Sequence, residues 1–367
     1  MNKYDINNIV EESFKYIDDY KDNFQLINDV QTDLLLGNRS AVYSPLITVI
    51  IPTYNRYELL KEAIDSVLNQ IIVDFEWEFI VIDNTPFDTD NQTPAFKLIR
   101  DINDEKILYY HNRVNIGSGY NWNRAVELAR GKWVTFLHDD DIMCSDALFN
   151  IKKIMDDYQN IKKPLGYIHT HKISFSESFD EKRARKKRLP VRLRITRNLA
   201  LVYGHTATGC PSCGTTILKD AYMRTGGINY DFGPTADAIL GYQIMKWYTV
   251  IKSDVVLGGY RWGDNETLKP ITIKSLLKSD QLFAEYRYSQ NKTSYIWGRY
   301  MGDVIRLNNV KGKLKLLRDD VCKFEIERNY VENVNLYWLK NMLQKVIISL
   351  VLIYNIRCLF NISIVDN

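Results

Sequence analysis

The stretch LITVIIPTYNRYELLKEAIDSVLNQ, residues 46–70, places an apolar run directly before an amphipathic one. Its first part is a short β-branched run that is typical of a buried strand, and this run stops at Pro52. We expect Asn55 to cap the following helix, with Glu58 three residues later completing a capping-box-like start. Apolar side chains then recur on one face over 59–68. The stretch therefore predicts a strand, a polar loop and a helix.

Three further apolar runs predict strands. They are EFIVI at 78–82, KILYY at 106–110 and KWVTFL at 132–137, and a helix over roughly 119–130 precedes the last of them. Strands that alternate with helices at this spacing indicate a mainly parallel sheet flanked by helices. The sequence therefore predicts the α/β class.

Polar residues follow three of these predicted strands. They are TYNR (53–56), DNT (83–85) and HDDD (138–141). Ligands of open α/β sheets bind beyond the carboxyl ends of the strands, so we expect these segments to lie side by side at one binding site.

The consecutive acids Asp139, Asp140 and Asp141 need positive charge nearby, because like charges repel more strongly where protein displaces water. A hard divalent cation, Mg²⁺ or Mn²⁺, would supply it and would polarise a phosphate-bearing leaving group. The alternative is an exposed acidic turn, or a helix start near residue 146 that Asp141 or Ser145 caps.

The composition is that of an ordinary folded protein. The chain has 367 residues, of which 46% are hydrophobic and 25% charged, and a formal net charge of +3 gives no argument for nucleic acid. Five cysteines are too few and odd in number for a disulfide framework. The N-terminus carries acids and no apolar signal-peptide core, so we expect a cytoplasmic protein.

Four motifs occur in the order found in glycosyltransferase family 2, and the chain resembles that family over about 46–265. The motifs are the opening stretch, EFIVIDN, RVNIGSGYNWNRAVELARGKWVTFLHDDDIM and MRTGGINYDF followed by ADAILGYQI. The resemblance implies the Rossmann-like GT-A fold. Its implied parts are a helical N-terminal extension (1–45), a nucleotide-binding part (46–142), an acceptor part (143–265) and a C-terminal helical region (266–367).

The resemblance also implies which residues hold the nucleotide. Tyr54 is expected to pack on the base, and Asp83 is expected to accept a hydrogen bond from a uracil-type base. Asp139 is expected near the ribose or the metal. The complete implied set is Pro52, Thr53, Tyr54, Asn55, Asp83, Asn115, Gly117, Asn123 and Asp139.

The resemblance also implies the metal-binding residues and the catalytic base. Asp140 matches the metal-binding acid of the family's D-x-D motif, with Asp141 in support, and Asp237 matches the catalytic base. Two positions depart from the family: His138 stands where the first acid of the motif usually is, and Ala236 replaces the Glu that usually precedes the base. The alternative for Asp237 is a helix N-cap.

Two segments are candidates for contact with a membrane surface. The basic run 182–197 either attracts anionic lipid and acceptor phosphates or is a solvated loop. The stretch 336–360 has an apolar core that is too short to span a bilayer. It either lies in the membrane plane or packs in protein, for example in a homo-oligomer interface.

The pair Cys210 and Cys213 is a candidate for a different kind of site. Together with His169 and His171 it could form a zinc or redox site. No second C-x-x-C accompanies it, and a turn near the acceptor pocket is the simpler interpretation.

The sequence therefore predicts a metal-dependent, inverting glycosyltransferase. We expect it to move a sugar from a nucleotide donor, UDP-linked by the resemblance, to a glycan or lipid-linked glycan at the cytoplasmic membrane face. The alternative is a non-catalytic binder of sugar nucleotides that acts as a scaffold of a glycan assembly complex.

Overall fold

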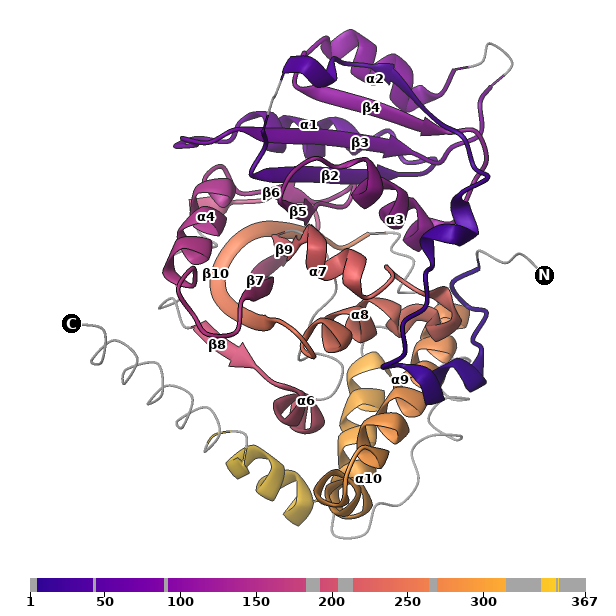
Figure 1. Cartoon of the computed structure of the whole chain (residues 1–367), viewed down its shortest axis with the longest axis vertical. Coiled ribbons are helices and arrows are strands. Elements are labelled where there is room, and N and C mark those ends of the chain that lie inside the picture. Colours follow the sequence, from indigo (N-terminus) through magenta and orange to yellow (C-terminus); the bar gives the residue numbers. More distant parts are fainter. Residues whose placement is uncertain are drawn as a thin grey trace.

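The computed structural model describes residues 5–41, 44–88, 92–182, 192–203, 214–263, 269–314, 338–347 and 349. Within these ranges ten strands form a single sheet that crosses the molecule, with the helices α9 and α10 at one end (Figure 1). The path of the sheet is β1-β4-β3-β2-β5-β9-β7-β10-β6, and β8 pairs with β10.

The first half of the sheet is parallel. It contains β2 (Ile47–Thr53), β3 (Trp77–Asp83), β4 (Ile107–Asn112) and β5 (Trp133–Phe136). These strands and the helices α1 (Leu60–Leu68) and α3 (Ser118–Leu128) confirm the α/β class and the elements expected from the apolar runs. The helix α2 (Pro94–Ile102) is an addition to the expected elements, and it begins where Thr93 accepts a hydrogen bond from Phe96 N.

Helices cover both faces of this sheet because side chains alternate along each strand. Ile47, Val49 and Ile51 of β2 pack in one buried cluster with α1, α2 and α4 (Ala147–Asp157). Ile50 of the same strand joins a second cluster with α3, α7 (Lys219–Arg224) and α8 (Ala236–Ile244).

The second half of the sheet is largely antiparallel. The strand β9 (Thr215–Leu218) pairs antiparallel with both β5 and β7 (Leu165–Phe175). The long β10 (Thr249–Arg261) runs parallel to β7 and antiparallel to β6 (Ile142–Met143) and β8 (Arg192–Ile195). The turn from β5 into β6 therefore brings the acidic segment between the two halves.

The N-terminal region differs from the expected helical extension. It contains the short 3-10 helices η1 (Glu11–Tyr16), η2 (Phe24–Ile27) and η3 (Arg39–Ala41), and the strand β1 (Thr32–Leu36). β1 pairs antiparallel with β4 and extends the sheet. A segment with apolar residues at α-helical spacing thus forms short 3-10 helices, because contacts with the rest of the protein override local preference.

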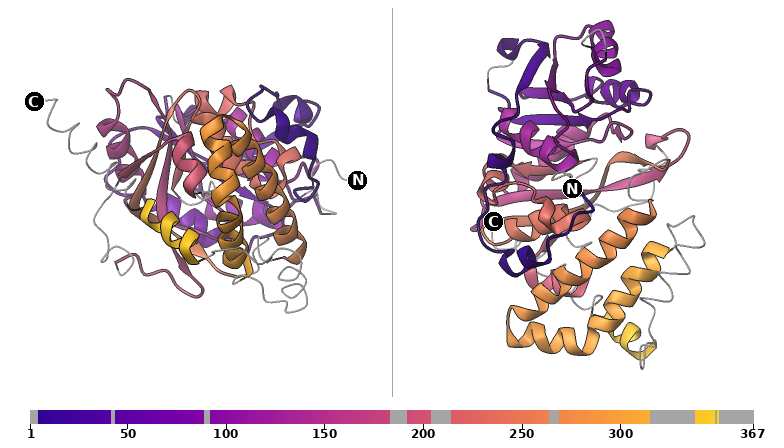
Figure 2. Two further views of the ribbon diagram at one scale, coloured as in Figure 1. Left: turned by 90° about the horizontal axis from the view of Figure 1, so that it is seen from below. Right: turned by 90° about the vertical axis from the view of Figure 1, so that its right-hand side faces the viewer.

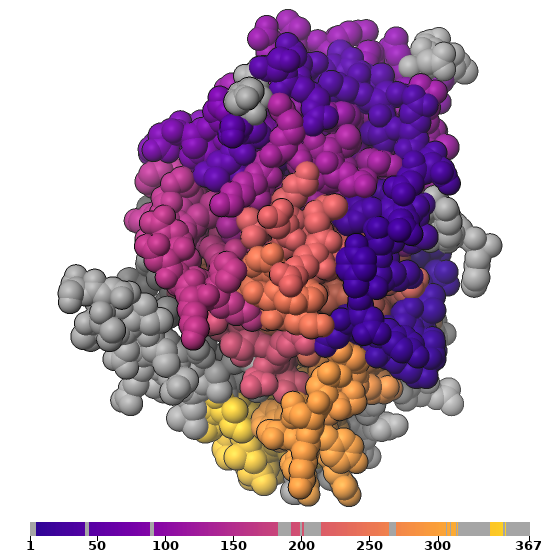
Figure 3. Space-filling model, viewed as in Figure 1, coloured from indigo at the N-terminus to yellow at the C-terminus, as the bar shows by residue number. Residues whose placement is uncertain are grey.

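Residues 5–30, here called the N-terminal clamp, pack against the segment before α8 (Figure 3). Ser13 Oγ donates to Asp231 Oδ2 at 2.9 Å, and Val10 N donates to Asp231 O at 2.9 Å. The clamp approaches two glycines closely: a Cβ on Gly226 would lie 1.9 Å from Lys21 O, and one on Gly233 2.7 Å from a side-chain carbon of Ile9.

Two expected helix caps are absent. α1 begins at Leu60 after Leu59, which makes no side-chain capping bond, and Asn55 lies in a bend after β2 with a positive φ of 53°. The prediction that Asn55 caps this helix is therefore wrong. α4 begins after Asp146, and Ser145 binds the carboxylate of Glu181, so neither Ser145 nor Asp141 caps it.

The C-terminal region is helical in its described part. α9 (Pro270–Ser289) and α10 (Lys292–Leu314) pack together, and a helix within 338–347 lies beside α10 (Figure 2). Asn308 Nδ2 of α10 donates to Asn341 Oδ1 and Gln344 Oε1, each at 3.1 Å. In the described part of the chain, no helix combines the length and apolar character that crossing a membrane requires.

Several predictions from the sequence fall on residues outside the described ranges. They are Cys210, Cys213, most of the basic run (183–191) and, within the stretch 336–360, residues 336–337, 348 and 350–360. At the described end of the basic run, Arg192 pairs with Asp157, and Arg197 pairs with Asp18 of the N-terminal clamp.

Replacing Gly226 by alanine should lower the free energy of unfolding by at least about 2 kcal/mol, because its φ is +82° and the clamp backbone leaves no space for a Cβ. Chemical denaturation of the purified variant measures this. Gly312 of α10 is the matched control, because nothing lies within 4 Å of the position that a Cβ would take there. Gly312→Ala should therefore raise the free energy of unfolding, by at most about 1 kcal/mol. Equal stabilities for the two variants would contradict the described packing of the clamp.

Burial lowers the pKa of His169 to about 3, with Lys252, Lys172 and His171 adding repulsion. The unfolded chain therefore binds a proton below about pH 6.5 that the folded protein does not bind, and stability is lost as the pH falls. His169→Gln should reduce the loss of unfolding free energy between pH 7 and pH 5 by about 1–2 kcal/mol. Unfolding curves at both pH values test this, and parallel pH profiles for the two proteins would refute it.

Candidate active site

The polar segments after β2, β3 and β5 lie side by side, as the strand order requires. β2 is the central strand of the three, and Thr53 at its end is in register with Asp83 at the end of β3. Asn84 N donates to Thr53 O at 3.0 Å, and Thr53 Oγ1 donates to Asp139 Oδ2 at 2.8 Å. The expected convergence at this edge of the sheet is confirmed.

Asp139 is a buried carboxylate fixed to the end of β2. Besides Thr53 Oγ1, it accepts a hydrogen bond from the backbone of Tyr54, and Arg56 Nη1 lies 3.6 Å from its Oδ1. Burial raises the pKa of Asp139 to about 7, against the opposing effects of Arg56 and Thr53. Near neutral pH this carboxyl group can therefore carry either a proton or a charge.

Asp140 and Asp141 are also buried, with exposed fractions of 3% and 0%. Burial raises the pKa of Asp141 to about 7, although it accepts a hydrogen bond from Arg261 N at 2.9 Å through Oδ1. Its other oxygen, Oδ2, has no hydrogen-bond donor among the described residues, and His138 Nδ1 lies 3.6 Å from it. A buried oxygen of this kind is one that a cation can satisfy.

The residues present fit a divalent metal ion. One ligand atom each of His138, Asp140 and Asp141 lies within 4.8 Å of the other two. Two carboxylates and an imidazole are ligands that suit Mn²⁺, whereas Mg²⁺ favours oxygen ligands. The departure at His138 is therefore a change of ligand type that keeps a metal-binding side chain at this position.

Arg261 contacts the acids from the end of β10, and no sequence motif identifies it. Its Nε donates to Asp140 O at 2.8 Å, and its Nη2 pairs with Glu62 of α1 at 2.5 Å. A local pattern cannot reveal this role, because Arg261 is 120 residues from Asp141. Only the pairing of β10 with β6 brings it to the site.

The loop after β2 presents the surface expected to receive a base. Tyr54 is 45% exposed, and Asn55 beside it is exposed and in the left-handed region. Asn55 N donates to Thr85 Oγ1 at 2.8 Å, and Pro52 is partly buried. Tyr54 thus lies on a loop held from both ends, next to the acids through its own backbone contact with Asp139.

Asp83 is placed differently from a group that meets a base directly. It is fully buried, and its oxygens accept hydrogen bonds from Thr85 N, Thr93 Oγ1 and Tyr109 Oη at 2.7–2.8 Å. Its described contacts are therefore internal and fix the loop after β3. Contact of Asp83 with a base stays a prediction.

Asn84, which the sequence-based site left out, organises the loop before α3. Its side chain donates to Asn115 Oδ1 at 2.7 Å and accepts from Ile116 N at 3.1 Å. Asn115 is exposed and also accepts from Gly117 N at 2.8 Å, and Gly117 has a φ of 73°. Asn115 and Gly117 thus lie near the end of β3, and their contact with a nucleotide stays a prediction.

Asn123 serves packing between α3 and the segment before η5 (Tyr230–Thr235). It is fully buried, accepts from Tyr222 Oη at 2.7 Å and Ile228 N at 2.9 Å, and donates to Ile228 O at 2.9 Å. These bonds use both the oxygen and the nitrogen of the side-chain amide, so we leave Asn123 out of the proposed nucleotide site.

Asp237 lies in the first turn of α8 and is only partly buried. Its Oδ1 accepts from Ala238 N at 2.6 Å. Burial raises the pKa of Tyr230, whose hydroxyl contacts Ser118 and Gly119 at the start of α3, and the charge of Asp237 adds to this increase. Asp237 is therefore near the start of α3, the same helix that the loop of Asn115 and Gly117 precedes.

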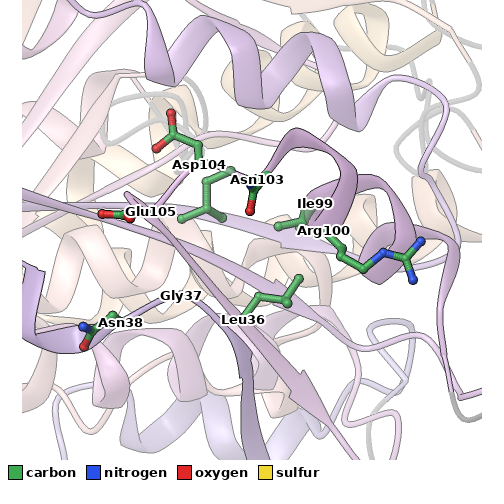
Figure 4. A pocket seen from close by; sticks show the side chains of 9 residues that line it. Leu36, Gly37, Asn38, Ile99, Arg100, Asn103, Asp104 and Glu105 are labelled. Atoms are coloured by element: carbon green, nitrogen blue, oxygen red, sulfur yellow. The ribbon is translucent and has the colours of Figure 1, made fainter.

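A cavity at the other edge of the sheet is separate from this site (Figure 4). It is lined by Leu36, Gly37, Asn38, Ile99, Arg100, Asn103, Asp104, Glu105 and Ile107. Ile107 is the first residue of β4, whereas the acids follow the last residue of β5. The cavity thus lies at the amino ends of the parallel strands.

Comparison with known proteins gives a family match for the segment that contains these strands. Residues 48–222 match the model of the family described as glycosyl transferase family 2. An uncharacterized glycosyltransferase of Methanocaldococcus jannaschii is 34% identical over 128 residues, which cover 34% of this chain and 42% of that protein. A GalNAc(5)-diNAcBac-PP-undecaprenol beta-1,3-glucosyltransferase of Campylobacter jejuni is 37% identical over 126 residues, covering 34% and 37%.

Solved structures are also similar, at lower identity. A mannosyltransferase from Pyrobaculum calidifontis, in complex with GDP-Man and Mn²⁺, has 16% identity and a TM-score of 0.47, and the match covers 92% of each chain. TarS of S. aureus has 14% identity and a TM-score of 0.47, covering 75% of this chain and 82% of that one. Both scores are too low to establish a property of this chain.

The match to the family model covers the parallel half of the sheet and the acids that follow β5. This chain spans less than half the length of the two curated relatives. Residues 48–222, just under half of the chain, form a domain of glycosyltransferase family 2.

Proposed function

We propose that this protein is a metal-dependent, inverting glycosyltransferase that uses a nucleotide-sugar donor. The observation that carries the proposal is the group formed by His138, Asp140 and Asp141 at the carboxyl edge of the sheet, with a buried Asp141 oxygen that lacks a described donor. When bound there, Mn²⁺ or Mg²⁺ would neutralise the acids and stabilise the charge that develops on a departing nucleoside diphosphate.

Tyr54 and the loop around it are the proposed nucleotide contact. An exposed tyrosine beside a buried acid offers a flat apolar face for a base. Thr53 and Asp139 are joined at 2.8 Å, so the base-binding loop and the metal-binding segment are held in fixed relation. Asp83 and Asn84 keep the neighbouring loops in place, and Asn115 and Gly117 complete the rim.

Asp237 is the proposed general base. A carboxylate at a partly buried helix start can accept the proton of an acceptor hydroxyl as that oxygen attacks the anomeric carbon. A single displacement of this kind inverts the anomeric centre. The N-terminal clamp supports this role indirectly, because it holds Asp231 and Gly233, which lie directly before α8.

The proposed acceptor class rests on the relatives' names, and the proposed UDP-linked donor rests on the family resemblance of the sequence. We propose a UDP-linked sugar and a glycan or lipid-linked glycan of the cell surface. The Campylobacter relative is named for an undecaprenol-linked acceptor, and another, of Bacillus subtilis, is named as a putative teichuronic acid biosynthesis glycosyltransferase. A site at the cytoplasmic membrane face, and contact with its anionic lipids or with a second copy of the chain, are part of this proposal.

The second candidate is a non-catalytic scaffold that binds sugar nucleotides. Ala236 favours it, because the family's Glu before the base is missing and Asp237 bonds to the adjacent amide of its own helix. The two candidates differ in one observable: the scaffold binds a donor without releasing nucleoside diphosphate.

Asp140→Asn should lower donor turnover by about 100-fold or more, because one metal ligand loses its charge. The measurement is UDP release from a panel of UDP-sugars with Mn²⁺ present, in water and with glycan acceptors. Asp74→Asn is the control, since Asp74 lies on the exposed loop before β3. Turnover by Asp140→Asn at the level of the control would exclude the metal-dependent mechanism.

Asp237→Asn should lower kcat by about 10²–10⁴-fold and leave the affinity for UDP unchanged, because a general base acts on the acceptor and not on the nucleotide. Single-turnover kinetics together with calorimetric UDP titration separate the two quantities. A parallel loss of UDP affinity would assign Asp237 to binding. Calorimetric donor binding by the wild type without any product would favour the scaffold.

A further inference from the structure

Arg56 pairs with Asp140, one of the three residues that could hold a metal ion. Its Nη2 pairs with Asp140 Oδ2, and its Nη1 lies 3.6 Å from Asp139 Oδ1. Both contacts bridge the loop after β2 to the turn after β5. A guanidinium thus supplies the positive charge that the buried acids require in the described structure.

The two arginines at this cluster differ in how firmly they are held. The side chain of Arg261 is 9% exposed and donates to Asp140 O, Glu177 O and Glu62, and it stacks on Phe175. The side chain of Arg56 is 41% exposed, and it pairs with the two acids Asp139 and Asp140. Arg261 is therefore a fixed part of the site, whereas Arg56 can swing into solvent at a small cost.

We infer that Arg56 is a displaceable counter-cation, which competes with the divalent metal for Asp140 and pairs with the nucleoside diphosphate once displaced. The inference rests on the proposed function and adds a regulatory step to the same site. A divalent ion bound to Asp140 would repel the guanidinium that pairs with the same carboxylate, so the ion and Arg56 compete for Asp140. Guanidinium groups bind phosphate oxygens well, so the diphosphate offers Arg56 a replacement partner.

This arrangement couples the two ligands. A metal ion that binds alone must displace Arg56 into solvent, whereas a metal ion that binds with the nucleotide leaves Arg56 paired. Nucleotide and metal should therefore each strengthen the binding of the other, by the same factor. Without donor, Arg56 weakens the binding of a metal ion, because it neutralises Asp140.

The test is the binding of MnCl₂ and UDP to the full chain, followed by calorimetry and by the Mn²⁺ spin-resonance signal. Without nucleotide, Arg56→Ala should bind Mn²⁺ about tenfold more tightly than the wild type, and in saturating Mn²⁺ it should bind UDP about tenfold more weakly. Arg56→Lys should lie between the two, because a point charge cannot bridge both acids. Arg100→Ala, which removes a 51% exposed arginine paired with Asp101, should change neither affinity.

The outcomes separate this inference from the proposed function. Equal Mn²⁺ affinities for the wild type and Arg56→Ala, in a protein whose Asp140→Asn variant loses the ion, would overturn the role of Arg56 and leave the metal site standing. A loss of Mn²⁺ affinity in Arg56→Ala, with thermal unfolding unchanged, would overturn it as well. No Mn²⁺ binding by any variant, with or without UDP, would overturn both.

Discussion

The site depends on burying three consecutive carboxylates where a parallel strand ends. Asp139, Asp140 and Asp141 are each at most 5% exposed, and burial of such groups costs free energy unless positive charge or hydrogen bonds offset it. The protein meets this cost with Thr53, Arg56 and Arg261, which come from distant parts of the chain. The acids therefore tie the two halves of the sheet together.

The same constraint explains the order of the sheet around the site. β5 must end between β2 and β9 so that Asp139 meets Thr53, and β6 must pair with β10 so that Asp141 meets Arg261. The mixed second half of the sheet is thus what supplies the fixed cation. The N-terminal clamp has a comparable role for α8, since it holds the segment from Gly226 to Gly233.

The strands β2 to β5 can be predicted because each begins with an apolar run, and α1 and α3 can be predicted because each has an apolar face. α2 is not among the expected elements, although it is as long as α1 and Thr93 and Pro94 are a recognisable helix start. β1 escapes prediction because its stability comes from pairing with β4, which lies far along the chain. Local preference does not encode such a pairing.

Only part of the candidate site can be predicted from the sequence, because some of its contacts also join distant parts of the chain. Runs such as HDDD after a strand identify acids from the sequence alone, and the family resemblance points to Tyr54 and Asp237. The roles of Arg56, Asn84 and Arg261 follow from contacts between residues 31–121 positions apart, which no local pattern indicates. From its motif position, Asn123 is expected to line the nucleotide pocket. The motif does not reveal that the amide of Asn123 forms its hydrogen bonds inside the core.

The most direct test of the account is anomalous diffraction from crystals grown with MnCl₂ and UDP, collected at the manganese absorption edge. If the acidic cluster is a metal site, one strong anomalous peak will lie within bonding distance of Asp140, with His138 or Asp141 as a second ligand. A map without a peak at these side chains, or with the ion bound elsewhere on the chain, would contradict the claim that the acidic cluster is a metal site.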